Sequence, residues 1–472
     1  MKKRNEIKEK ELKFLAQEYK KFPHLFQRRF FIEDGKFLEK FGIFIPGKKE
    51  LSCGFLKLWP QDFIVEEIYK GKEVQSIYPE KFSIEKKNSS HLPTIYATLV
   101  KCNISTLEAI EEIANSLNLE QKNIQTAGMK DKDAITSQKI SFRKISLKKL
   151  EKLKSPYFFL KNALYDKGVV EKGALEGNKF TILVRTEENF QKENFFKKIK
   201  EIEKQGFYNF YYLQRFGTPR LINFHWGFSI LKGDYKKAIF NFLSSPGKQE
   251  LPYFQEIRKE IKKNWNNWQK IEEILTPFPI IFQNELKLVR YLKKRPGDFL
   301  GALKQIPEQI ILWIFAFSSW LFNNKLALYI KEKEKLPKTL PLFLSKDKED
   351  WFFYQDFLKK LKIFPPPFQN LKPYPYIQLK KREIKTKEKA KIEKIKIIPE
   401  GVILSFSLSK GVYATTFLAH LFNFFSGVPP KNISDLPVDT KATLGEKSLE
   451  DVLNCFHEVI HPKTENIFEK FL

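Results

Sequence analysis

The residues best suited to do chemistry lie in one short charged loop. The stretch GMKDKD, residues 128–133, interrupts a strand-like segment from Ile124 to Phe142, which predicts a loop between two strands. Lysines on both sides of Asp131 would lower the pKa of its carboxyl group and favour the ionised form that a carboxylate nucleophile requires. Ordinary charged turns show the same pattern, so these residues alone leave the catalytic interpretation open.

Other kinds of active site find little support in the sequence. Cys53, Cys102 and Cys455 lie far apart with no CxxC spacing, so neither a disulfide scaffold nor a zinc motif is expected. His457 and His461 are four residues apart but lack a third ligand or an intervening glutamate base. No phosphate-binding or dinucleotide-binding glycine pattern is found either.

The charge balance points to a polyanionic partner. The chain has 84 Lys+Arg against 56 Asp+Glu, a formal net charge of +28. A surface this positive repels itself unless a polyanion relieves the charge, and nucleic acid is the commonest such partner because it releases counterions on binding. A biased genome that favours Lys, Ile, Phe and Asn is the competing explanation.

The chain is expected to be soluble and cytoplasmic, with no membrane partner. Its first residues, MKKRNEIKEKELKF, lack the apolar core of a signal peptide. The longest uncharged apolar run, Ile310 to Phe322, is too short to span a bilayer comfortably and predicts a core helix instead.

The elements that must position the charged loop can be read from hydrophobic periodicity. Alternation around Phe63, Phe180 and Val402 predicts half-buried strands, while Ser105 and Glu108 form a possible capping box at the start of a helix. Residues 1–22 have apolar positions at helical spacing and predict a basic amphipathic helix. Residues 231–379 are mostly helical and lie between strand-rich segments, which suggests an insertion.

The loop and four other blocks together resemble a known family. GMKDKDAITSQ, residues 128–138, closely resembles the signature GxKDxxAxTxQ of the TruD family of tRNA pseudouridine synthases. The other blocks match in the family's order: Lys57 with PQDFIVEE (60–67), GALEGNKFT (173–181) with Arg185, NFYYLQRFG (209–217) and FSLSKGVYATT (406–416). In addition, AFSSWLFN (316–323) resembles a helix of the family, A-x-Q-S-x-x-F-N. The sequence departs from these patterns at Gln61, Tyr211, Ser318 and Ser409, where Glu, Phe, Gln and Pro are usual.

The resemblance implies an isomerase that detaches uracil from its ribose and rejoins it through carbon 5. The family's nucleophile falls on Asp131, and attack either at the ribose C1′ or at the base remains open. Neither route needs a metal, nucleotide or redox cofactor, so the resemblance implies none, in agreement with the missing glycine and zinc patterns. Asp133 stands at a variable position of the pattern and is expected to be a solvated loop residue.

The resemblance also implies residues that bind the substrate: Lys57, Lys130, Asn209, Tyr211 and Arg215. Tyr211 matches the family's aromatic position, where a ring can hold a base that has left its stack; a core role for it remains open. Asn209 could bond the uracil edge, brace Asp131 or form a turn. Lys57 could keep Asp131 ionised, contact phosphate or be solvated, and Arg215 could contact phosphate or brace the fold.

By resemblance the fold class is α+β: a catalytic domain with a mixed, largely antiparallel sheet flanked by helices, plus an inserted family-specific α+β domain. We expect a basic N-terminal extension (1–50), a catalytic domain in two parts (51–230 and 380–429), the inserted domain (231–379) and a C-terminal tail (430–472).

By this resemblance we expect a monomeric tRNA pseudouridine synthase that acts at the family's usual uridine, near position 13 of tRNA. Other structured RNAs remain possible substrates, and the basic helix in 1–22 is expected to extend the RNA contact. The alternative is a non-catalytic RNA-binding protein or tRNA chaperone on the same scaffold. An RNA methyltransferase would need a glycine-rich cofactor loop, which is not found.

Overall fold

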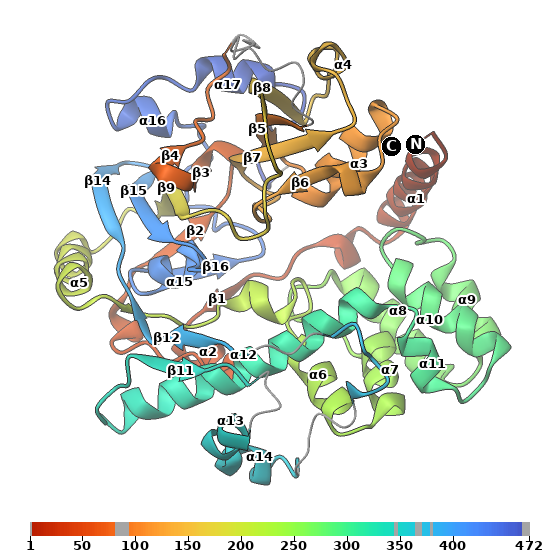
Figure 1. The fold of residues 1–472 in the computed structure, drawn as a ribbon. Coiled ribbons are helices and arrows are strands. Elements are labelled where there is room, and N and C mark those ends of the chain that lie inside the picture. Colours follow the sequence, from red (N-terminus) through yellow and green to blue (C-terminus); the bar gives the residue numbers. More distant parts are fainter. Residues whose placement is uncertain (1, 81–93, 344–347, 364–370, 378–380, 465–472) are drawn as a thin grey trace. The chain divides into compact units, whose positions relative to one another are not determined.

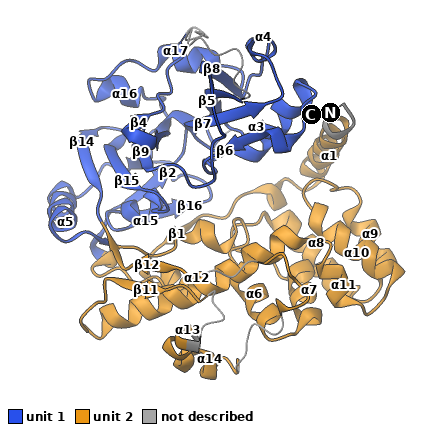
Figure 2. Ribbon diagram, in the orientation of Figure 1, with its two compact units in different colours: residues 1, 50–207, 389–465 blue, residues 2–49, 208–388, 466–472 orange. Residues whose placement is uncertain are grey.

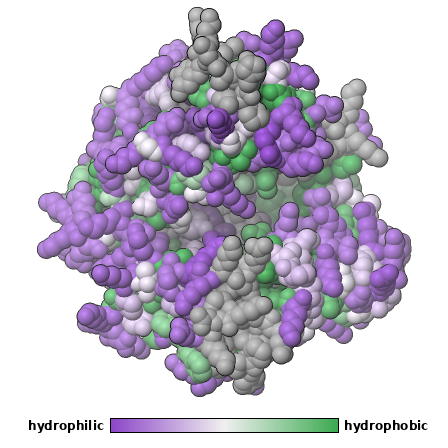
Figure 3. Space-filling view, viewed as in Figure 1, coloured by the Kyte–Doolittle hydropathy of each residue, from purple (hydrophilic) through white to green (hydrophobic). Residues whose placement is uncertain are grey.

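The structure is a computed structural model that describes residues 2–80, 94–343, 348–363, 371–377 and 381–464 (Figure 1). The chain divides into two units, unit 1 with residues 50–207 and 389–465 and unit 2 with residues 2–49 and 208–388 (Figure 2). On the face drawn in Figure 3, hydrophilic side chains cover most of the described surface, as the charged composition leads one to expect.

Unit 1 contains most of the strands. Its strands are β2 (Cys53–Leu56), β3 (Phe63–Tyr69), β4 (Glu73–Val74), β5 (Thr94–Cys102), β6 (Ile124–Thr126), β7 (Ile135–Arg143), β8 (Phe158–Asp166), β9 (Gly177–Thr186), β14 (Lys391–Ile398), β15 (Gly401–Ser409) and β16 (Asn423–Ser426). Its helices are α3 (Thr106–Ser116), α4 (Leu147–Glu151), α5 (Lys192–Gln205), α15 (Ala414–Ala419), α16 (Thr440–Thr443) and α17 (Glu450–Cys455). The predicted strands around Phe63, Phe180 and Val402 are confirmed, but most of their successive residues are buried, so the strands are not half-buried as predicted.

The sheet of unit 1 is centred on β9. Ile182 of β9 lies opposite Leu404 of antiparallel β15 on one side and opposite Phe63 of antiparallel β3 on the other. The sheet continues from β3 through parallel β7 to antiparallel β5 and β8. This mixed, largely antiparallel sheet flanked by helices confirms the predicted α+β class.

Both faces of β5 are covered, which explains its nearly continuous apolar sequence. Ile95 and Leu99 pack with α3, which begins at the predicted capping box of Ser105 and Glu108. Val100 and Cys102 alternate to the opposite face and pack against Val452 and Phe456 near the C-terminus. The segment predicted as a C-terminal tail thus contributes to the unit 1 core, through the buried residues Leu449, Val452, Phe456 and Val459.

Unit 2 is mostly helical. Its helices are α1 (Lys2–Lys21), α2 (Gly35–Leu38), α6 (Asn223–Leu231), α7 (Tyr235–Ser244), α8 (Pro252–Lys263), α9 (Trp268–Leu275), α10 (Gln283–Lys294), α11 (Phe299–Leu303), α12 (Pro307–Lys331), α13 (Lys348–Phe353) and α14 (Gln355–Lys360). Its strands are β1 (Phe31–Glu33), β11 (Thr339–Pro341), β12 (Glu383–Lys385) and β13 (Lys387–Glu388), and the short β10 (Phe207–Tyr208) lies at the boundary between the units.

The domain boundaries differ from the sequence prediction at both ends of the insertion. Unit 2 begins at residue 208 instead of 231 and ends at 388 instead of 379. Residues 2–49, predicted as a separate N-terminal extension, belong to unit 2. The reason is packing, because Leu15 and Ala16 of α1 are buried. The ring centroids of Phe14 and Phe278 are 5.4 Å apart, and the Glu11 carboxylate accepts hydrogen bonds from the main-chain N–H groups of Ile280 and Ile281.

Helix α12 forms the core of unit 2. It is long and apolar enough to cross a membrane by length and composition, but most of its apolar window is buried inside the protein, as the prediction of a core helix requires. Helix α12 packs so closely on α6 that a Cβ atom at Gly227 would lie 2.1 Å from the carbonyl oxygen of Trp313. The ring centroids of Trp226 and Trp313 are 5.1 Å apart.

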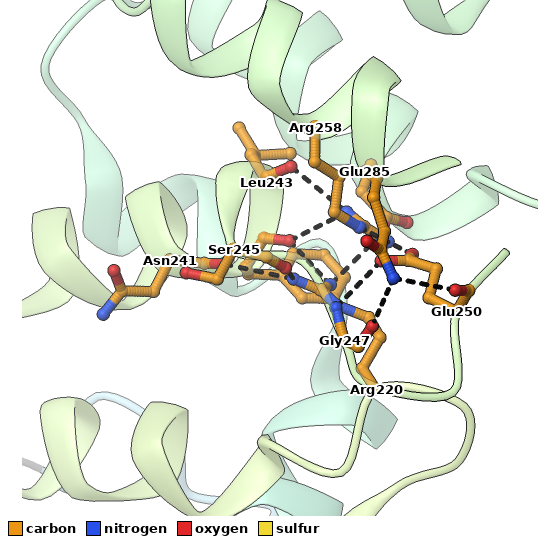
Figure 4. A network of polar contacts seen from close by, with 10 residues as sticks. Arg220, Asn241, Leu243, Ser245, Gly247, Glu250, Arg258 and Glu285 are labelled. Atoms are coloured by element: carbon orange, nitrogen blue, oxygen red, sulfur yellow. Dashed lines mark hydrogen bonds and ion pairs between the residues drawn. The ribbon is translucent and has the colours of Figure 1, made fainter. Parts of the chain in front are cut away.

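A buried polar network ties the neighbouring helices of unit 2 together (Figure 4). The Arg258 guanidinium contacts Glu250 at 2.7 Å and Glu285 at 3.3 Å, and Arg220 donates to the carbonyl oxygen of Phe242 at 2.8 Å. Because these charges are removed from solvent and paired with one another, we assign the network a structural role.

Candidate active site

The loop that carries Asp131 connects β6 to β7 in unit 1, as predicted, and hydrogen bonds hold its backbone. The Lys130 N–H donates to the Thr106 hydroxyl at 3.0 Å, and that hydroxyl donates to the Gln138 side chain at 3.0 Å. The Gln138 amide in turn donates to the Gly128 carbonyl oxygen at 3.0 Å. The first and last residues of the GxKDxxAxTxQ signature therefore fix the loop from both sides.

Lys57 lies directly against Asp131, although the two are far apart in sequence. Its Nζ donates to Oδ1 of Asp131 at 2.6 Å, and the side chains are 15% and 37% exposed respectively. The Lys57 ammonium also lies 4.1 Å from the centroid of the Phe63 ring. Lys57 adopts a φ of 60°, in the left-handed region that lysine rarely occupies, so its backbone is held in an uncommon conformation beside the carboxylate.

A buried ion pair anchors the segment that follows Lys57. Arg185 of β9 donates to both carboxylate oxygens of Asp62, at 2.7 and 2.9 Å, and both side chains are fully buried. The Trp59 N–H donates to the same carboxylate at 3.0 Å. This bidentate geometry links the turn after Lys57 to the central strand of the sheet.

The electrostatic environment keeps Asp131 ionised. Burial against the surrounding protein raises the pKa of its carboxyl group, but the charge and hydrogen bond of Lys57 and the charge of Lys101 outweigh this effect. The pKa of Asp131 therefore lies below its ordinary value. A partly exposed, ionised carboxylate is the chemical form that a nucleophile needs.

Lys101 is a site residue that the sequence analysis missed. It is fully buried at the end of β5, and its ammonium donates to the carbonyl oxygen of Asp131 at 2.5 Å. Burial lowers the pKa of Lys101 to about 7. The signal in the sequence was a single lysine within the apolar run YATLVKC, because a lysine is rarely buried unless its charge has a partner.

Lys130 points to a different partner from the one expected. Its ammonium contacts Glu67 at 2.6 Å, and the two side chains are 4% and 0% exposed. Glu67 also accepts the N–H of Lys139 at 3.0 Å. These contacts favour a structural role for Lys130 over the substrate contact that the sequence predicted.

Asp133, the other carboxylate of the loop, is largely exposed. Its side chain is 55% exposed and lies 3.7 Å from the Lys463 ammonium. The exposure fits the expected solvated loop residue, while the contact joins the loop to the C-terminal segment.

The predicted substrate residues Asn209, Tyr211 and Arg215 belong to unit 2, and the structure describes them within that unit. The Asn209 amide donates to the Lys385 carbonyl oxygen at 3.0 Å. Tyr211 is 9% exposed, and the Arg215 guanidinium lies 4.9 Å from the centroid of the Tyr211 ring. These contacts hold the three side chains within unit 2.

Asn323 of α12, another residue that the sequence analysis gave no role, fixes the main chain of Tyr211. Its side chain accepts the Tyr211 N–H at 2.9 Å and donates to the Tyr211 carbonyl oxygen at 2.8 Å. Its amide also donates to the carbonyl oxygen of Phe41 at 3.0 Å. The sequence offered a signal, since Asn323 ends a block that resembles a helix of the family.

Among the described residues, no cluster of three or more His, Cys, Asp or Glu could hold a metal ion. Burial raises the pKa of the Cys102 thiol to about 12, so this cysteine is a poor nucleophile.

Comparison with known proteins gives a consistent result. The family model for tRNA pseudouridine synthase D (TruD) matches residues 48–342. A probable tRNA pseudouridine synthase D from Methanococcus aeolicus is 31% identical over 280 residues, which cover 57% of this chain and 68% of that protein. The tRNA pseudouridine synthase D of Aquifex aeolicus is 26% identical over 407 residues, 78% of this chain and 97% of that one.

A solved structure shares the fold. The crystal structure of a putative tRNA pseudouridine synthase D from Methanosarcina mazei superposes with a TM-score of 0.59 at 23% identity. The match covers 81% of this chain and 97% of that chain.

Proposed function

Because the chain belongs to the TruD family of tRNA pseudouridine synthases, we propose that it isomerises uridine to pseudouridine in tRNA with Asp131 as nucleophile. The observation that carries the proposal is the ion pair of Asp131 with Lys57 at 2.6 Å on a carboxylate that is 37% exposed. Such a carboxylate is both charged and accessible. The target that we propose is the uridine near position 13.

The proposed reaction exchanges bonds and needs no oxidant or reductant. The bond from N1 of uracil to C1′ of ribose breaks, and a bond from C5 to C1′ forms. C5 loses its proton and N1 gains one, so substrate and product are isomers. Asp131 supplies the electron pair for the covalent step, at C1′ or at the base, and leaves as the carboxylate when the new bond is complete.

Lys57 supports this chemistry through its charge. In the free enzyme its ammonium keeps Asp131 ionised. When the carboxylate is regenerated at the end of the reaction, the same ammonium stabilises the charge that returns to it. We place Lys57 among the groups that set the reactivity of Asp131, and a phosphate contact is not required for this role.

We also propose that the chain needs no cofactor, acts as a monomer and is located in the cytoplasm. The isomerisation transfers no electrons and no group to or from a third molecule, so it needs no electron carrier or group carrier. Tyr211, Asn209 and Arg215 remain the proposed substrate residues of unit 2, on the strength of the family resemblance.

The test is conversion of tRNA by the purified chain without added cofactor. Transcribed tRNA is incubated with the protein and digested to nucleosides, and pseudouridine is measured by chromatography; a second tRNA lacks the uridine near position 13. We expect pseudouridine in the first tRNA and none in the second. Tight tRNA binding with no pseudouridine would instead support the RNA-binding or chaperone alternative.

A further inference from the structure

Lys101 joins two loops of unit 1 from inside the protein. Its ammonium donates to the carbonyl oxygen of Asp131 at 2.5 Å and to that of Ile104 at 2.8 Å. The first carbonyl belongs to the loop between β6 and β7, and the second precedes α3. A single buried cation therefore fixes the main chain of Asp131 relative to the start of α3.

The burial of this cation is costly for the fold. Lys101 is fully buried, and removing an ammonium from water is unfavourable unless it is paired. A methionine of similar length would fill the same space without charge. Lys161, on the adjacent strand β8, offers a comparison: it is 1% exposed, but its ammonium contacts the Glu80 carboxylate at 2.8 Å. The charge of Lys101 is directed instead at the Asp131 loop.

We propose that Lys101 is a positioning residue for the reaction, and that its ammonium form holds the Asp131 loop in the geometry from which the carboxylate attacks. The inference rests on the proposed function of Asp131. It assigns to Lys101 no contact with the substrate, because the side chain is covered by protein.

The charges around Lys101 make this hold sensitive to pH. Burial lowers the pKa of Lys101, Asp131 and Cys102 raise it, and the positive charges of Lys57 and Lys130 lower it further, to about 7. The lysine therefore loses its proton in the neutral range. A charged donor binds a carbonyl oxygen more strongly than a neutral amine does, so the loop is held more firmly below pH 7 than above it.

The experiment follows the single-turnover rate of pseudouridine formation from pH 5.5 to 9, with enzyme in excess over tRNA. The wild-type rate should fall by about tenfold as the pH rises through about 7, a change that corresponds to one weakened charged hydrogen bond. Lys101→Met should show the lower rate at every pH. Lys101→Arg keeps its charge throughout, so its rate should show no fall in this range.

Lys161→Met is the matched control, since it removes an equally buried lysine that contacts neither Asp131 nor its loop. It should retain the wild-type fall in rate. Circular dichroism and the midpoint of thermal unfolding check that each variant is folded. If Lys101→Met does not fold, the pH profile of Lys101→Arg is the test.

Three results would overturn the inference while leaving the proposed function intact. The first is a Lys101→Met enzyme whose rate equals that of the wild type. The second is a Lys101→Met enzyme whose rate still falls with pH as the wild-type rate does. The third is an equal loss of rate in Lys101→Met and Lys161→Met, with the pH profile of both unchanged. A wild-type chain that forms no pseudouridine would contradict the proposed function itself, and the inference would fall with it.

Discussion

At the residue scale, two lysines act on Asp131 from different directions. Lys57 contacts a carboxylate oxygen at 2.6 Å, and Lys101 contacts the main-chain carbonyl at 2.5 Å. We propose that Lys57 sets the charge of the Asp131 carboxylate and that Lys101 fixes the position of the Asp131 main chain. Their effects should therefore be separable by pH.

Removal of Lys57 should make Asp131 harder to ionise. In Lys57→Met the pKa of Asp131 loses its largest lowering influence, the charge of Lys57, and therefore rises. Because the reaction needs the carboxylate, the rate falls as pH drops through this pKa, and the fall should occur at higher pH in the variant. Single-turnover rates between pH 4 and 7 measure the shift.

Lys132→Met is the control for this prediction, because Lys132 also lies next to Asp131 in sequence but its side chain is 56% exposed and contacts Glu108. Its acid limb should match that of the wild-type enzyme. An unshifted acid limb in Lys57→Met would show that the ion pair does not control the ionisation of the reacting group.

The burial of Lys101 should also be visible in stability, without any substrate. Its pKa is about 7 in the folded protein and 10.5 when exposed, so between these values the unfolded chain binds more protons. The free energy of unfolding should then rise with pH relative to Lys101→Met, by up to about 1.4 kcal/mol per pH unit. Denaturant unfolding at pH 7 and 9 measures this; a difference between the two proteins that is independent of pH would contradict it.

The sequence could indicate Asp131 because its signature is local, and the family resemblance added Lys57. It could not show that Lys130 pairs with Glu67 in the interior while Lys101 reaches the loop, because burial depends on contacts made by strands distant in sequence. With many lysines in the chain, neither composition nor spacing distinguishes the buried ones.

At the element scale, the C-terminal segment completes unit 1. Its apolar residues cover one face of the sheet, and its backbone meets the loops around the candidate site: the Lys463 N–H donates to the Leu58 carbonyl oxygen at 2.8 Å, and Asn103 donates to that of Val459 at 2.7 Å. The segment lies outside the family's motifs, so the sequence alone predicts only a tail there. Its few apolar residues are too short a pattern to predict burial, which depends on the face of β5 that they cover.

Substitution of Phe456 should therefore destabilise unit 1. The side chain is 1% exposed and its ring stacks on Phe159 at 5.5 Å. Phe456→Ala should lower the free energy of unfolding by about 3–5 kcal/mol, the usual cost of removing a buried phenyl group. Urea unfolding followed by fluorescence measures the change.

Leu436→Ala is the matched control from the same segment, since Leu436 is 61% exposed. It should change the free energy of unfolding by no more than about 0.5 kcal/mol. Equal, small effects of the two substitutions would mean that the segment does not form part of the core.

At the scale of the whole molecule, the net charge of +28 should govern the affinity for tRNA. Each phosphate neutralised by a lysine or arginine releases counterions, so binding weakens as salt rises. The basic N-terminal helix is predicted from the sequence to take part in this binding. Because α1 buries Leu15 and Ala16 in unit 2, its deletion would also damage the fold, and substitution of exposed lysines is the sharper test.

The triple change Lys8→Gln, Lys10→Gln and Lys20→Gln removes exposed positive charge from α1. If the helix binds RNA, tRNA affinity should fall and the slope of log K against log salt should decrease by about 0.7–0.9 for each phosphate that the helix no longer neutralises. Filter binding at several salt concentrations measures both. The same number of charges removed at Lys259, Lys263 and Lys270, which pair with nearby glutamates, is the control. Equal effects of the two triple changes would contradict a specific role of α1 in RNA binding.

The central claim is that the Asp131 carboxylate performs the covalent step, and tritium release tests it most directly. Uridine tritiated at C5 loses its label when C5 bonds to ribose, so release from such a tRNA reports the isomerisation itself. Asp131→Asn should release no more tritium than a control without protein, while Asp133→Asn, which alters a side chain 55% exposed two residues away, should retain release. Release by Asp131→Asn at the wild-type rate would contradict the account.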